Sequence, residues 1–238
     1  MHNFKIQLLN KMLELWMIIY VVGALICFAI AYRAFFVKKK LTQSRKLFGL
    51  LSFLFGLICI LDLLSQAAGP TKLSVYIQHS LTMLYPFPMF LLMLIPLTLY
   101  KDIRGKTVLK IMIFPLLVGL IGVGDVIDTE AENFGDTTFV KFIYNEDLYS
   151  IWLFLNFIPV VVMYYFFYKI FKTPDVRANK DSMKRLKMFA LAFTILIITG
   201  YAFAIAEMIF GTPPLSSIGA ASGVSLAMIA FKLRKERM

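Results

Sequence analysis

The chain has 238 residues, of which 60% are hydrophobic and only 16% are charged, and its formal net charge is +11. Its apolar residues come in long uninterrupted runs and do not alternate with polar ones, which is typical of a membrane protein. This composition argues against a soluble enzyme, a disulfide scaffold, a nucleic-acid-binding domain and a disordered chain.

The apolar runs predict helices that cross a bilayer. A helix needs roughly 20 apolar residues to cross about 30 Å of hydrocarbon, and a membrane barrel would instead show short alternating segments. Five runs pass this length, and the second and fourth are marginal. We expect an all-α membrane protein, a single domain over 1–238, with seven spans near 14–36, 47–68, 75–100, 107–124, 148–171, 187–210 and 214–232.

The basic residues predict the orientation of this bundle. Of the 25 Lys and Arg residues, 21 fall in 33–46, 101–110, 169–187 and the tail from Lys232, which seven spans place on one side. Cytoplasmic loops are enriched in Lys and Arg. The amino terminus is therefore predicted to lie outside, the carboxyl terminus in the cytoplasm, and the whole chain in the plasma membrane.

Acidic residues gather on the opposite side. Seven of the 14 carboxylates lie in 125–147, which we interpret as an outer loop. Such a loop is either simply a solvated surface, or its negative charges create an electrostatic field that attracts cations or a basic ligand. Its spacing does not match an EF-hand, and we predict no metal site.

Polar residues inside the spans mark a candidate pocket, because charged groups in hydrocarbon are costly. Asp62 lies about 24 Å past the inner boundary at Lys46, at about 1.5 Å per residue. Gln66 shares its helix face, and His79 and Glu207 fall at a similar height on other helices, as does Glu14. The alternatives are that Glu14 and Glu207 lie at the interface and that His79 is a packing residue. We predict an outward-facing pocket whose ligand-binding candidates are Asp62, Gln66, His79, Glu207 and Tyr85.

Two patterns predict irregular or close packing. Pro86 and Pro88 lie inside the third span, where proline kinks a helix and suits a hinge. Gly219 and Gly223 form G-x-x-x-G in the seventh span, which lets helices approach closely. We expect this face to pack within the chain in preference to between chains, which leaves an oligomer possible.

The absent motifs limit the chemistry. Two histidines are too few for a His-rich zinc site, and no H-E-x-x-H, G-x-S-x-G or P-loop motif occurs. The seventh span holds no lysine before Lys232, which excludes a retinal Schiff base in mid-helix. We predict no cofactor and no catalytic residue.

Three stretches resemble a known family: the proline-bearing 83–90 (MLYPFPMF), the aromatic 147–152 (DLYSIW), and 211–215 (GTPPL) before a small-residue helix. In them the chain resembles the seven-helix amino-terminal sensory region that precedes histidine kinase or cyclic-dinucleotide domains in archaea and bacteria. The resemblance implies a region that senses something outside or within the membrane and passes a helix movement inward. Since no kinase, PAS or cyclase domain follows Lys232, we expect either a sensory fragment or a stand-alone relative that needs a partner.

The leading hypothesis is a receptor-like sensory module that binds a small ligand, a proton or a lipid group and reports to a cytoplasmic signalling protein. Its partners would be the bilayer and that protein, with no nucleic acid. The alternatives are a small-solute or ion transporter or channel, which needs a polar path to the inner face, and an intramembrane enzyme, which lacks an identifiable nucleophile–base pair.

The predicted orientation has a direct test. Asn-x-Ser/Thr acceptor sites placed in 125–147 should be glycosylated in a eukaryotic host, because only outer segments meet the glycosylation machinery. Modification of acceptors placed in 33–46 instead would reverse the orientation.

Overall fold

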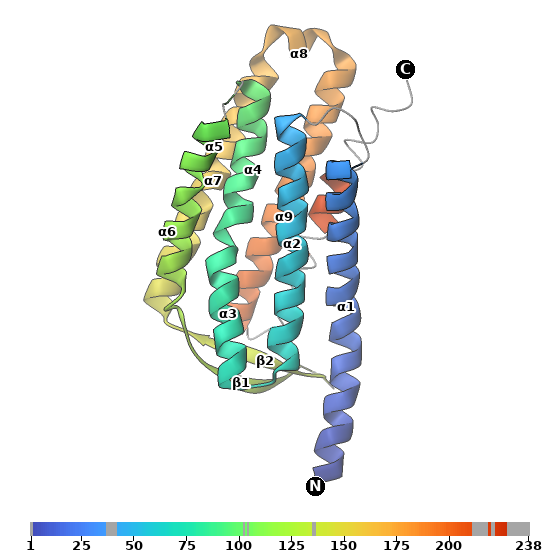
Figure 1. The fold of residues 1–238 in the computed structure, drawn as a ribbon, viewed down its shortest axis with the longest axis vertical. Coiled ribbons are helices and arrows are strands. Elements are labelled where there is room, and N and C mark those ends of the chain that lie inside the picture. Colours follow the sequence, from blue (N-terminus) through green and yellow to red (C-terminus); the bar gives the residue numbers. More distant parts are fainter. Residues whose placement is uncertain are drawn as a thin grey trace.

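The computed structural model describes residues 2–36, 42–101, 103, 105–134, 137–210, 219 and 222–227. Most of these residues are helical (Figure 1). The elements in chain order are α1 (His2–Phe36), α2 (Gln43–Ala67), α3 (Lys72–Leu84), α4 (Pro86–Tyr100), α5 (Gly105–Ile111), α6 (Ile113–Gly122), β1 (Val126–Phe134), β2 (Thr137–Tyr144), α7 (Glu146–Lys172), α8 (Pro174–Ala178) and α9 (Lys180–Phe210).

Six helical segments in the described part of the chain are long and apolar enough to cross a membrane. They are Ile18–Phe36, Gln43–Ala67, Lys72–Tyr100, Gly105–Gly122, Glu146–Lys172 and Lys180–Ala206. The expectation of a helical membrane protein is therefore confirmed, and these segments match the first six predicted spans. The predicted span 214–232 lies outside the described residues except for Gly219 and 222–227, which are helical.

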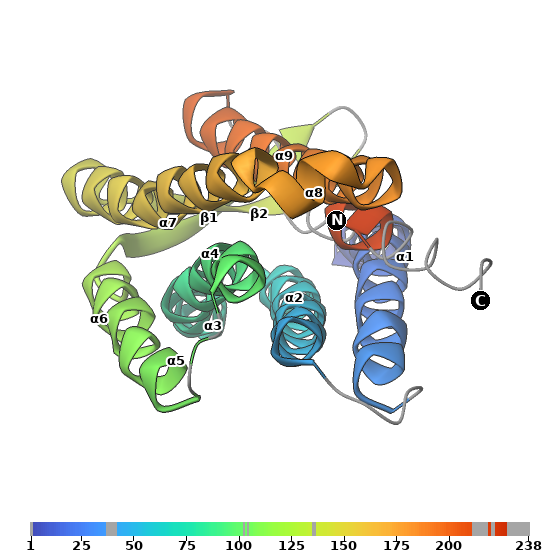
Figure 2. The same ribbon diagram turned by 90° about the horizontal axis from the view of Figure 1, so that it is seen from above.

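The helices form a bundle that is closed at one end by the β-hairpin. Figure 2 shows α1, α2, α3 with α4, and α5 with α6 in a curved row, with α7 and α9 across one side of it. The short helix α8 lies at the end opposite the hairpin (Figure 1). Large apolar side chains such as Leu109, Phe154 and Ile198 are exposed on the outer faces of the helices, as expected for surfaces that meet lipid.

Two of the six spans are broken near proline. The third is divided at Tyr85 into α3 and α4, and the fourth at Met112 into α5 and α6. Proline has no N–H and its ring displaces the carbonyl four residues earlier, so Pro86 frees the Thr82 carbonyl and Pro115 frees that of Ile111. Pro159 sits inside α7, which continues through it.

The segment 125–147 is not the loop that we predicted from the sequence. It contains the antiparallel hairpin of β1 and β2, in which Glu130 pairs with Lys141 and Ala131 with Val140. Val126, Val140 and Phe142 turn toward the bundle and are buried, and Lys141 contacts Glu130 at 3.4 Å and Glu132 at 3.0 Å. The β-branched and aromatic residues of 137–144 favour a strand, and burial of their apolar face against the bundle outweighs the solubility of the acidic residues.

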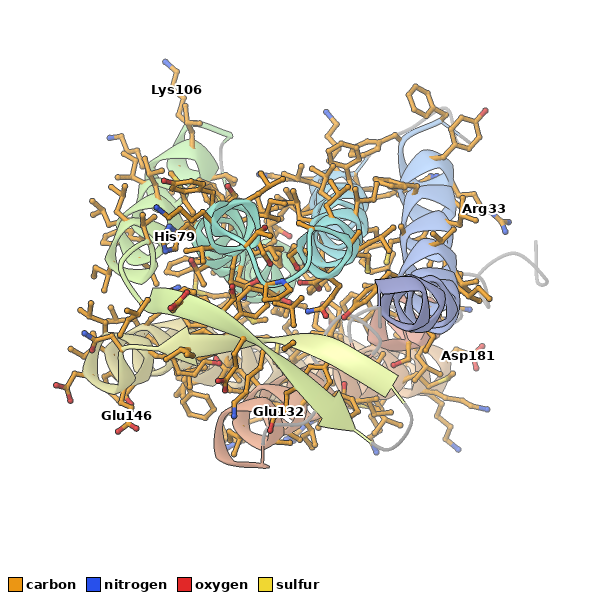
Figure 3. The ribbon with its side chains drawn as sticks, turned by 90° about the horizontal axis from the view of Figure 1, so that it is seen from below. Arg33, His79, Lys106, Glu132, Glu146 and Asp181 are labelled. Carbon is orange, nitrogen blue, oxygen red and sulfur yellow. The ribbon has the colours of Figure 1, made fainter. Side chains whose placement is uncertain are left out.

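The hairpin is fastened to the helix ends by side chains of α2 and α3. Gln66 donates from Nε2 to the Val140 carbonyl at 3.1 Å and accepts the Val140 N–H at 2.9 Å. The Nε2 of His79 lies 2.9 Å from the Val126 carbonyl oxygen, and Gln78 Nε2 donates to the Tyr144 hydroxyl at 3.4 Å. Figure 3, viewed from this end, shows the two strands lying across the bundle. The hairpin is therefore held in place by hydrogen bonds at both of its strands.

Gly219 and Gly223 lie against α9 of the same chain. A Cβ atom on Gly219 would overlap the side chain of Thr199, and one on Gly223 would overlap Leu196. The absence of side chains therefore allows the backbone around them to approach α9 closely.

Candidate functional site

A cavity of about 80 Å³ lies inside the bundle near the hairpin end. A single buried water needs only about 10–15 Å³, so the space is larger than one water requires. The helices α2, α3, α4, α7 and α9 line the cavity, and β2 contributes Tyr144. The lining residues are Phe55, Asp62, Gln78, Thr82, Tyr85, Met89, Tyr144, Tyr149, Trp152, Leu153, Asn156, Leu196, Gly200, Tyr201 and Ala204.

Aromatic rings form one continuous wall of this cavity. The ring of Trp152 packs edge-to-face against Tyr85, with centroids 6.2 Å apart and planes at 86°. Its other neighbour, Tyr149, stacks at 5.8 Å, and Tyr144 of the hairpin lies 4.4 Å from Tyr149. Rings packed in this way form a large apolar surface, so this wall suits an apolar group.

The position of Trp152 follows from the break between α3 and α4. Its indole Nε1–H donates to the Thr82 carbonyl at 3.2 Å, the same carbonyl that Pro86 leaves without its helical partner. The Thr82 hydroxyl lies within hydrogen-bond distance of the Gly122 carbonyl of α6, at 3.1 Å, and of the His79 carbonyl of its own helix, at 3.0 Å. Gly122 also leaves space for the indole, because a Cβ atom there would lie 2.5 Å from Trp152 Cδ1. Three helices are thus joined at Thr82.

Buried polar side chains supply oxygen atoms to the cavity. The Asp62 side chain comes from α2 and is 5% exposed. Asn156 donates from Nδ2 to the Trp152 carbonyl at 2.9 Å, which leaves its Oδ1 as an acceptor without a hydrogen-bond partner among the described residues. The Oε1 of Gln78 and the hydroxyl of Tyr201 are buried in the same condition. Buried acceptors of this kind are costly unless a ligand or water occupies them.

Between the cavity and the end of the bundle at α8, the interior is packed with apolar side chains. Leu51, Leu92 and Met163 are each fully buried, and the rings of Phe167, Phe189 and Phe193 contact one another with centroids 4.3–6.2 Å apart. The cavity floor is formed by Phe55, Met89 and Leu196. The polar site is therefore confined to the hairpin half of the bundle.

The structure brings two of the predicted pocket residues together at the cavity. Asp62 and Tyr85 line it, whereas Gln66 and His79 do not and instead bind the hairpin. The side chains of Glu207 and Glu14 lie outside the described residues. Pro86 and Pro88 are buried at the start of α4, next to Tyr85.

Sequence reasoning missed most of the uncharged residues of the site. They are Gln78, Thr82, Tyr144, Tyr149, Trp152, Asn156 and Tyr201. A signal was present in Gln78 and Asn156, since amide side chains are rarely buried in an apolar environment without a hydrogen-bonding purpose. Among the described residues, no group of three His, Cys, Asp or Glu side chains is arranged to hold a metal ion.

A second buried carboxyl lies at the junction of α6 and the hairpin. Asp125 is fully buried, and its backbone carbonyl accepts the Asn145 N–H. Burial raises the pKa of the Asp125 carboxyl to about 7, and the backbone N–H of Val126 partly offsets this effect. Asp125 precedes Val126, whose carbonyl binds His79. The carboxyl group that titrates therefore lies where the hairpin meets α3.

Comparison of the chain with models of known protein families and with curated proteins finds no match. The resemblance to sensory regions therefore stays a prediction, and the site is interpreted from its own geometry.

The Asp125 carboxyl predicts a specific pH dependence of stability. Because its folded pKa of about 7 exceeds the ordinary 3.8, the folded protein retains a proton that the unfolded chain releases between these values. The free energy of unfolding should therefore fall as the pH rises from about 4 to about 7 and level off above that. Thermal unfolding of the detergent-solubilised protein measures this slope.

Asp125→Asn should remove that part of the slope and be the more stable protein at pH 8 by a few kcal/mol. The control is Asp128→Asn, which changes an exposed carboxylate of the same hairpin and should keep the slope. An unchanged slope in Asp125→Asn would refute the assignment.

Proposed function

We propose that the chain is a receptor-like sensory protein of the plasma membrane with seven transmembrane helices. Its amino terminus lies outside the cell and its carboxyl terminus lies in the cytoplasm. A small ligand, a proton or a lipid group binds in the cavity around Asp62, and a helix movement reports this to a cytoplasmic signalling partner. The observation that carries the proposal is a largely apolar cavity with buried polar groups. It adjoins a proline break in its own wall and is closed by apolar packing on the side toward α8.

The hinge at Tyr85 supplies a physical route from the cavity to the other end of the bundle. Tyr85 lies between α3 and α4 and contacts Trp152, so a ligand that displaces either ring changes how α4 meets α7. Both helices continue to the far end, at Tyr100 and Lys172. A ligand drives this change only if it binds one helix arrangement better than the other.

The distribution of charge supports the proposed orientation. The hairpin end carries Glu130, Glu132 and Glu146, and the opposite end carries a basic surface that includes Lys101, Lys106, Lys110, Lys169, Lys172, Arg177, Lys180, Lys184, Arg185 and Lys187. Figure 3 shows Glu132 on the hairpin and Glu146 at the start of α7. Basic ends of this kind face the cytoplasm and suit contact with anionic lipid headgroups or an acidic partner surface.

The alternatives gain less support. A transporter or channel needs a polar path through the bundle, and the packed rings of Phe167, Phe189 and Phe193 occupy the place where that path would continue. An intramembrane enzyme needs a nucleophile and a base; among the described lining residues Thr82 and Asp62 are of these types, and the Thr82 hydroxyl is directed at the backbone carbonyls of His79 and Gly122.

Filling the cavity should move the far end of the bundle. Gly200 lines the cavity and has open space where a Cβ would lie, so Gly200→Leu mimics an occupied site. Spin labels on cysteines placed at Lys101 and Lys172, in a Cys27→Ala/Cys59→Ala background, report the separation of α4 and α7. We expect the mean label distance to shift by about 1–2 Å, the size of helix shifts in signalling transitions.

The matched control is Gly200→Ala, which adds helix propensity but leaves the cavity open and should keep the original distance. Identical distances in the Leu and Ala variants would contradict the proposed coupling. Solute flux through proteoliposomes that is lost in Asp62→Asn would favour the transporter instead.

A further inference from the structure

The cavity is rich in hydrogen-bond acceptors and contains no basic side chain. Its described lining includes the Asp62 carboxyl, Gln78 Oε1 and Asn156 Oδ1, and none of the lining residues is Lys, Arg or His. The amide nitrogens of Gln78 and Asn156 each donate one hydrogen bond away from these oxygens, to the Tyr144 hydroxyl and to the Trp152 carbonyl. Both amides therefore present oxygen to the cavity, and a carboxyl group lies with them.

The remaining walls select further properties of the ligand. The rings of Tyr85, Tyr149 and Trp152 line the cavity and contact one another, which gives it an aromatic side. Phe55, Met89 and Leu196 form an apolar side of the same space. The volume of about 80 Å³ favours a small occupant.

We infer that this cavity is a binding site for a small organic ammonium group that carries N–H donors and a short apolar tail. The ammonium pairs with the Asp62 carboxylate and donates hydrogen bonds to Gln78 and Asn156, while the tail lies against the apolar side. An anion finds no basic partner here, and a quaternary ammonium has no N–H for the two amide oxygens. This inference rests on the proposed function, because it names the class of ligand for the same cavity.

Two sources could supply this chemistry: a free amine and the headgroup of phosphatidylethanolamine. Both present a primary ammonium with N–H donors. The experiment therefore uses the full chain in nanodiscs of either phosphatidylcholine alone or a mixture with phosphatidylethanolamine.

The fluorescence of Trp152 reports binding directly, since this ring lines the cavity. The chain has two tryptophans, and Trp16→Phe leaves Trp152 as the only one. We expect n-propylammonium to change its emission saturably in phosphatidylcholine discs. Three compounds should each bind at least about tenfold more weakly. 1-Propanol has no charge, tetramethylammonium has no N–H donor, and propionate is an anion.

Two variants locate the site. Asp62→Asn should weaken n-propylammonium at least about tenfold, and Gly200→Leu should abolish the response by filling the space. Glu132→Gln, which alters a carboxylate of the hairpin surface, should bind like the parent and controls for general attraction of cations. In discs containing phosphatidylethanolamine, the Trp152 emission before amine is added is compared with that in phosphatidylcholine discs. An emission that is already shifted identifies the lipid headgroup as a source. An unshifted emission that then responds to added amine identifies free amine.

Three results would overturn the inference: no saturable response to n-propylammonium in either disc, binding of tetramethylammonium or 1-propanol as tight as that of n-propylammonium, or unaltered binding in Gly200→Leu. None of these depends on α4 moving. Amine binding without a change in the Lys101–Lys172 label distance would refute the sensory proposal alone, and a distance change without amine binding would refute only the ligand assignment.

Discussion

One hydrogen bond, from the Trp152 indole to the Thr82 carbonyl, links the backbone of this bundle to its candidate site. Pro86 removes the donor that this carbonyl would use in a continuous helix. Inside a bilayer no water is available to replace it, so a protein group must. The indole of α7 does so, and the break in the third span becomes the point where α3, α4 and α7 meet.

The rest of the site follows from that constraint. With Trp152 held at the break, its ring faces Tyr85 and Tyr149, and Asn156 lies one turn further along α7. The Asn156 amide donates to the Trp152 carbonyl and turns its oxygen to the cavity. The hairpin completes the enclosure through Tyr144, and the packed phenylalanines close the opposite side. A small change at the cavity therefore acts on the one place where the backbone of the third span is already interrupted.

The sequence predicts the spanning helices well, since long apolar runs admit few alternatives to a helix in lipid. The prolines likewise predict the break at Tyr85. Asp62 and Gln66 share a helix face in the prediction, but Gln66 lies one turn nearer the end of α2, and there its side chain binds the hairpin instead of lining the cavity. The hairpin itself was missed because its acidic residues mask the strand-forming run at 137–144. Gln78 and Asn156 were missed because an amide attracts less attention than a charge, yet it too must be satisfied when buried.

The bond between Trp152 and the break can be observed by NMR of the ¹⁵N-labelled indole N–H in the Trp16→Phe protein, with Pro86→Ala as the comparison. Alanine restores a backbone N–H that competes for the Thr82 carbonyl. We expect the Trp152 indole proton to be protected from solvent exchange in the parent, and in Pro86→Ala we expect its resonance to shift and its protection to fall. An indole resonance and exchange rate that are the same in both proteins would show that the indole does not bind the Thr82 carbonyl.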